Sequence, residues 1–219
     1  MNRIPISEPE WWMYILEMWM DLQEKSDLVY NLAPIFADIF VITYPIFLVA
    51  LYIFAIVKKR NDLKQWAFYV FFCTLFAVLV NIFLQSFLLK ERPIAILSQV
   101  DVEDTIFHEI LPESSFPSDH AVVSMSFAIA VLIWWIYNKK KFFIWSGVWF
   151  ILISLVMTCC RVLTFVHRPS DILAWLGLWI IIPLILFIKP IRKTLFRFMI
   201  DPIIKLEKLI VKKIFNYEQ

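Results

Sequence analysis

The sequence predicts an all-α integral membrane protein: a polytopic helical bundle with about five transmembrane helices, in a single domain of residues 1–219. Two observations support this. The chain is 61% hydrophobic with a mean hydropathy of +0.74, above the roughly 45–50% apolar content of soluble domains. It also contains five uncharged runs, each about as long as a bilayer-crossing helix: 39–57, 65–89, 121–138, 142–160 and 172–188. Because lipid admits only helices and closed barrels, and these runs are too long for strands, we expect helices.

The charged residues predict how the bundle is oriented. If the N-terminus lies outside and the five runs alternate, the inside segments are 58–64, 139–141 and 189–219. These segments hold 15 of the 21 Lys and Arg residues but only 4 of the 19 acidic ones. Short basic loops stay in the cytoplasm. We therefore expect a multi-pass protein of the plasma or inner membrane with a cytoplasmic C-terminus. The net charge of +2 reflects this separation and is no sign of a nucleic-acid partner.

The two ends of the chain are predicted to lie on the membrane surface. Residues 1–33 form an expected outer interfacial segment, in which "EWWMYILEMWM" (10–20) is an interfacial helix with its indoles at headgroup level. Residues 34–188 form the expected transmembrane core. The tail, 189–219, interleaves Leu, Ile and Phe with Lys and Arg at helical spacing. It is interpreted as a basic amphipathic segment on the cytoplasmic surface, drawn to anionic lipid.

Polar residues gather in three stretches expected on the outer side. These are Asn81 and Gln85 with "LLKERP" (88–93), then "FPSDHA" (116–121), and "CRVLTFVHRPSDILAW" (160–175). The two Pro-Ser-Asp triplets are explained as helix caps. Capping does not explain His120, His167 or the nearby arginines.

These residue types fit phosphoryl transfer. A helix N-terminus attracts anions, Arg forks match phosphate oxygens, and histidines suit nucleophilic and acid–base work. The sequence shows no cluster of metal ligands. We therefore expect a metal-independent site without a cofactor, in which arginines neutralise the phosphate.

Three motifs in this order resemble the phosphatidic acid phosphatase type 2 superfamily of membrane lipid phosphatases: Arg92-Pro93, Pro117-Ser118-Asp119-His120, and Arg161 with His167 and Asp171. The resemblance implies that His167 attacks phosphorus to form a phosphohistidine, that Asp171 orients it, and that His120 protonates the leaving oxygen. The predicted phosphate-binding residues are Arg92, Arg161, Ser118, Asp119, Gln85, Lys90 and Arg168.

The sequence departs from the family pattern at three positions. Gln85 stands where the family usually has Lys, Asp119 where it has Gly, and Cys160 where it has Ser. "PSDH" resembles the bacterial subgroup that converts undecaprenyl diphosphate to undecaprenyl phosphate in cell-wall biogenesis, and this is the expected reaction.

Other functions remain open from the sequence. The substrate could instead be phosphatidic acid, phosphatidylglycerophosphate or a lipid A phosphate. Gln85 and Asp119 also leave open a non-catalytic lipid-phosphate binder or a flippase. The oligomeric state is not predicted.

Three further features are interpreted as structural rather than catalytic. His108 is expected to be a solvated loop histidine. The surrounding acidic run is interpreted as a solvated face, with a divalent-cation site as the alternative. Asp38, near the outer edge of the first run, is interpreted as a carboxylate that snorkels to the membrane surface, with a role in substrate entry as the alternative.

Overall fold

The structure, a computed structural model, describes residues 4–5, 11–93, 114–139 and 141–215. At 4–5, 23–24, 141–143, 173–178, 212 and 214–215 it describes the backbone alone. His108 and the acidic run around it lie outside the described residues.

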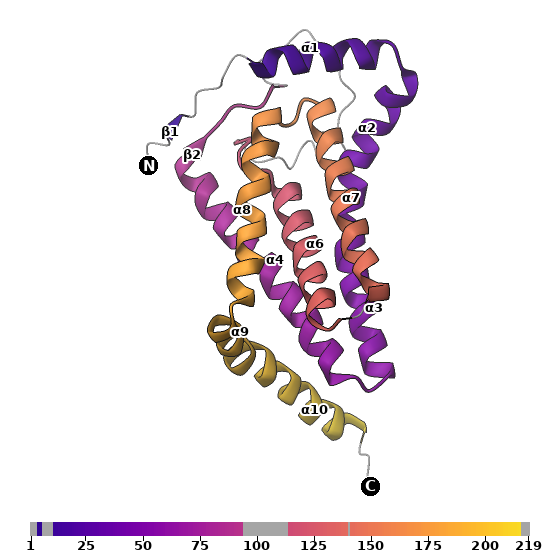
Figure 1. The fold of residues 1–219 in the computed structure, drawn as a ribbon, viewed down its shortest axis with the longest axis vertical. Helices are drawn as coiled ribbons and strands as arrows, with labels where there is room; N and C mark the ends of the chain where they lie inside the picture. Colours follow the sequence, from indigo (N-terminus) through magenta and orange to yellow (C-terminus); the bar gives the residue numbers. More distant parts are fainter. Residues whose placement is uncertain (1–3, 6–10, 94–113, 140, 216–219) are drawn as a thin grey trace.

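The described chain folds as a bundle of helices that run along one long axis (Figure 1). Its helical elements, in order, are α1 (Trp11–Glu24), α2 (Asp27–Ile39), a 3-10 turn (Phe40–Ile42), α3 (Thr43–Val57), α4 (Asn61–Phe87), α6 (Asp119–Tyr137), α7 (Lys141–Leu163), α8 (Pro169–Phe187), α9 (Lys189–Leu195), a π-helical stretch (Phe196–Ile200) and α10 (Asp201–Phe215). Two short strands, β1 (Ile4–Pro5) and β2 (Leu88–Leu89), pair in parallel. The predicted all-α fold is confirmed.

Among the described residues, four helical segments are long and apolar enough to cross a membrane: Asp27–Val57, Asn61–Phe87, Asp119–Tyr137 and Ile144–Leu163. They correspond to the first four predicted runs, which confirms a polytopic membrane protein. The first segment begins twelve residues earlier than expected, because α2, the 3-10 turn and α3 follow one another without a break. The fifth run coincides with α8, and its crossing of the membrane stays a prediction.

The helix α6 lies at the centre of the bundle, where it contacts α4, α7 and α8. Small buried side chains on α6, such as Ala121, Ala128 and Ala130, let neighbouring helices approach closely. The approach is close beside α7, where a Cβ atom at Gly147 would lie 2.8 Å from the Cα and Cβ atoms of Leu132. Only glycine fits there without a shift of one helix.

An aromatic cluster joins three helices in the middle of the bundle. Tyr44 of α3, Phe127 of α6 and Phe150 of α7 contact one another with ring centroids 5.2–5.4 Å apart, the range in which aromatic pairs attract. The Tyr44 hydroxyl lies 2.9 Å from the Ser154 hydroxyl, so its polar end is hydrogen-bonded inside the apolar core.

The first helix, α1, lies across one end of the bundle (Figure 1). Trp12 and Leu16 are buried and pack with Val162 and Phe165. The face that was expected to enter the lipid headgroups therefore contacts the protein in part. Trp11 is 39% exposed and fits the interfacial expectation better.

At the opposite end of the bundle, α9 and α10 leave the core (Figure 1). Lys64 of α4 forms an ion pair with Glu207 of α10, and Gln65 donates a hydrogen bond of 2.8 Å to Asp201. Large apolar side chains of the tail remain exposed, among them Phe198, Leu206 and Leu209. This surface fits the predicted amphipathic tail.

We predict that Gly147→Ala destabilises the protein by about 1–3 kcal/mol, because the added methyl overpacks the contact between α6 and α7. Thermal unfolding of purified protein in detergent measures the change. Leu152→Ala is the control, because Leu152 is on the same helix and 49% exposed. Equal midpoints for Gly147→Ala and the parent would contradict the packing described here.

Candidate active site

The three polar stretches meet at the end of the bundle covered by α1. Hydrogen bonds to backbone carbonyls connect them. The Ser115 N–H donates to the Lys90 carbonyl at 2.7 Å, and within the third stretch the His167 N–H donates to the Arg161 carbonyl at 3.1 Å. The Arg92 guanidinium donates to the Val166 carbonyl at 3.0 Å. Residues far apart in sequence thus surround one small volume.

The His167 ring is held by a backbone carbonyl. Its Nδ1 atom lies 2.7 Å from the Ser115 carbonyl oxygen. Because a carbonyl can only accept, Nδ1 carries the proton of the neutral imidazole and the lone pair is on Nε2. Burial, with the positive charges of Arg161 and Arg92, lowers the pKa of His167 to about 4, although Asp171 acts in the opposite direction. The imidazole is therefore neutral at physiological pH.

Asp171 supports this histidine electrostatically and caps α8. Its Oδ2 atom accepts a hydrogen bond of 2.9 Å from the Arg168 N–H and lies 3.8 Å from His167 Nδ1. That second distance exceeds a hydrogen bond. Asp171 also forms a buried ion pair with Lys90, whose ammonium group lies 3.0 Å from the Ser170 hydroxyl. Lys90, a predicted phosphate ligand, is therefore directed toward Asp171.

Two buried arginines face the same volume. Arg92 donates to the carbonyls of Val166 and Ser114, at 3.0 and 3.2 Å. Burial and the nearby charge of Arg161 lower the pKa of Arg92 to about 10. Like charges held close together away from water attract an anion between them. The two guanidinium groups therefore give this part of the site a local positive charge.

Asp38 is the residue that sequence reasoning misplaced. It does not snorkel: it is fully buried, and its Oδ1 atom accepts a hydrogen bond of 2.5 Å from Arg161 Nη1. The same oxygen lies 3.4 Å from His120 Nε2. The signal was present in the sequence, because a carboxylate inside a membrane span usually faces the bundle interior and pairs with a cation. Starting the first span at 39 placed Asp38 outside it.

Asp119 has a structural setting that the sequence did not reveal. Its Oδ1 atom accepts hydrogen bonds from Asn81, at 2.5 Å, and from Gln85, at 3.1 Å. Gln85 also donates to the Pro117 carbonyl at 2.8 Å. Two of the departures from the family pattern, Gln85 and Asp119, therefore contact each other.

The remaining predicted residues lie at the start of their helices. Ser118 is the N-cap residue of α6, but its side chain makes no capping hydrogen bond. Arg168 is buried, with its guanidinium carbon 4.7 Å from the centre of the Trp12 ring. Trp12 was not predicted as part of the site, and no sequence signal linked α1 to Arg168.

The described residues contain no group of three His, Cys, Asp or Glu side chains that could hold a metal ion. The site consists of two histidines with arginines, a lysine and three carboxylates.

Residues 66–195 match the family model of the PAP2 superfamily. No curated protein and no solved structure matches the chain. The matched segment runs from α4 to the end of α9 and contains His120, His167, Arg92, Arg161 and Asp171. Because it covers more than half of the 219 residues, the chain belongs to the PAP2 superfamily, whose members are phosphatases.

Proposed function

We propose that the protein hydrolyses a lipid diphosphate through a phosphohistidine intermediate, with undecaprenyl diphosphate as the substrate and undecaprenyl phosphate as the product. One observation supports the mechanism most directly. A neutral His167 is fixed through Nδ1 by the Ser115 carbonyl, while two buried arginines act electrostatically on its ring. A nucleophile and positive charge for a phosphate are thereby combined.

In the proposed first step, His167 Nε2 attacks the terminal phosphorus and the bond to the bridging oxygen breaks. Arg92 and Arg161 bind the phosphoryl oxygens. Arg161 can do so while bonded to Asp38, because a guanidinium has five N–H donors and this contact uses one. Positive charge at fixed positions stabilises the negative charge that develops in the transition state.

His120 is the proposed proton donor to the leaving oxygen. Its Nε2 atom faces Asp38 at 3.4 Å, so we assign Nδ1 to proton transfer. The Asp38 carboxylate would favour the charged imidazolium and fix the plane of the ring. In the second step, His120 removes a proton from water, which attacks the phosphohistidine. The P–N bond then breaks, phosphate leaves and His167 is restored.

The choice of substrate rests on Asp119 and Arg168. Asp119 gives the chain its "PSDH" motif, and Asn81 and Gln85 satisfy its carboxylate. Arg168, at the start of α8, is the proposed contact for the second phosphate.

By the distribution of Lys and Arg, this end of the bundle faces the periplasm or the extracellular side. Phosphatidic acid, phosphatidylglycerophosphate and lipid A phosphate are the alternative substrates, and a non-catalytic lipid-phosphate binder or a flippase is the alternative function.

We predict that His167→Ala lowers phosphate release from undecaprenyl diphosphate by about 10³-fold or more, because the covalent step is lost. Phosphate is measured in detergent with a chelator present, over a panel that includes the three alternative substrates. His108→Ala is the control and keeps full activity. Full activity of His167→Ala would exclude the mechanism, and tight lipid retention without turnover by the parent protein would favour the binder.

We predict that Asp38→Asn slows hydrolysis of the lipid substrate by about 10²-fold, through weaker proton donation by His120. An aryl phosphate whose leaving group departs as an anion needs no proton, so its hydrolysis should fall far less. Asp38→Glu, which keeps the charge, should recover part of the rate. If Asp38→Asn slows the hydrolysis of both substrates equally, Asp38 acts only by holding Arg161 and has no part in proton donation by His120.

We predict that Lys90→Met moves the acid limb of kcat/KM to higher pH by about one unit. Without the ammonium group, the Asp171 charge stabilises protonated His167 and raises its pKa from about 4. Since the neutral ring is the nucleophile, a raised pKa requires a higher pH for activity. Ser170→Ala removes a Lys90 contact without a charge change and serves as the control. Superimposable acid limbs for Lys90→Met and the parent would contradict this coupling.

A further inference from the structure

A charged cavity lies at the opposite end of the bundle from His167. It has a volume of about 390 Å³ and lies among α4, α6, α9, the π-helical stretch and α10. Its lining residues are Trp66, Tyr137, Arg192, Lys193, Phe196, Arg197 and Asp201. Trp66 is near the start of α4, whereas Gln85 of the candidate active site is near its end. The cavity is therefore separate from the candidate active site.

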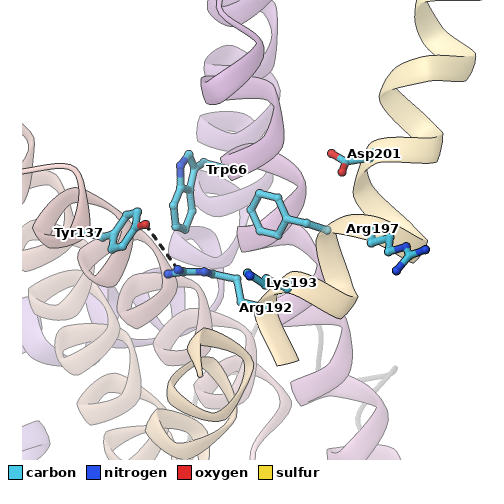
Figure 2. A pocket seen from close by; sticks show the side chains of 7 residues that line it. Trp66, Tyr137, Arg192, Lys193, Arg197 and Asp201 are labelled. Atoms are coloured by element: carbon cyan, nitrogen blue, oxygen red, sulfur yellow. Dashed lines mark hydrogen bonds between the residues drawn. The ribbon is translucent and has the colours of Figure 1, made fainter. Parts of the chain in front are cut away.

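The cavity is cationic, and one of its cations is held in place. Arg192 lies over the Tyr137 and Phe187 rings, at 4.5 and 4.6 Å from their centres, and donates to the Tyr137 hydroxyl at 3.5 Å. Figure 2 shows Arg192 and Lys193 below Trp66, with the Arg197 side chain pointing away from them. A guanidinium fixed between aromatic rings loses little freedom when it binds an anion.

The single carboxylate of the lining is satisfied by a different part of the fold. Asp201 accepts a hydrogen bond of 2.8 Å from Gln65. Three cations thus line the cavity against one carboxylate that already has a donor. The balance favours a ligand that carries negative charge.

The surroundings of the cavity indicate a lipid rather than a free ion. The cavity lies where α8 ends and α9 begins, and α10 beyond it exposes Leu206, Leu209 and Ile210. An amphipathic helix of this kind lies at the membrane surface. This is also the end that carries most of the Lys and Arg residues and is expected in the cytoplasm, where anionic lipids are concentrated.

We propose that this cavity binds the phosphate headgroup of an anionic phospholipid, with Arg192 and Lys193 as the phosphate ligands and Trp66 as the apolar wall. Bound lipid would connect α9 to α4 and α6 and set the angle at which the tail meets the membrane. The proposal does not depend on the catalytic function.

Native mass spectrometry of the full chain in detergent tests this site, with phosphatidylglycerol and phosphatidylcholine of matched acyl chains as probes. We expect the parent to retain phosphatidylglycerol about tenfold better, and Lys193→Gln to lower that retention about fivefold, the change expected for one surface charge. Lys205→Gln, an exposed charge on α10 outside the cavity, is the matched control and should change little.

Several outcomes would overturn the proposal. Equal losses for Lys193→Gln and Lys205→Gln would show general attraction to a basic tail, and equal retention of the two lipids would show no headgroup site. Glycerol phosphate that binds as tightly as the lipid would identify a site for soluble phosphates. Arg192→Gln is a second variant, whose unfolding midpoint is measured alongside because Arg192 also packs on Tyr137. His167→Ala should retain phosphatidylglycerol like the parent. A failure of the lipid-site proposal can therefore be told apart from a failure of the catalytic proposal.

Discussion

The buried ion pair between Asp38 and Arg161 is the interaction on which the polar end of the bundle depends. Both side chains are almost fully excluded from solvent. A single charge in that position would be very unfavourable, and removing one partner of a buried pair typically costs about 3–5 kcal/mol. The pair therefore holds α2 against α7. Because the same Asp38 oxygen faces His120, it also couples the position of the first span to the candidate active site.

The two histidines share one arrangement. Each lies within 4 Å of a carboxylate that also binds a cation: His120 beside Asp38 and Arg161, and His167 beside Asp171 and Lys90. The carboxylates come from different helices, α2 and α8. Neighbouring charges that compensate one another in a buried site are held rigidly, since any displacement leaves one of them unpaired. Such a site is organised before the substrate arrives, which is the condition for electrostatic catalysis.

The contact between Gln85 and Asp119 changes how the departures from the family pattern are understood. Taken singly, a lost lysine and an added carboxylate both weaken a phosphate site. In the fold, the Gln85 amide donates to the Asp119 carboxylate, with Asn81 as the second donor. The two changes form one hydrogen-bonded unit at the start of α6. Hydrogen bonds of this kind compensate the burial of a polar group.

The sequence by itself determined the membrane-helical fold, because long apolar runs are local signals, and the order of its three polar motifs is readable along the chain. Only the tertiary structure decided which partners these residues have. Asp38 is fully buried because α2 packs on α7. There its carboxylate pairs with Arg161, which is more than 120 residues away in the sequence. Trp12 meets Arg168 only because α1 folds over the end of the bundle. Contacts between distant helices arise from packing and charge compensation in three dimensions, and no periodicity in the chain encodes them.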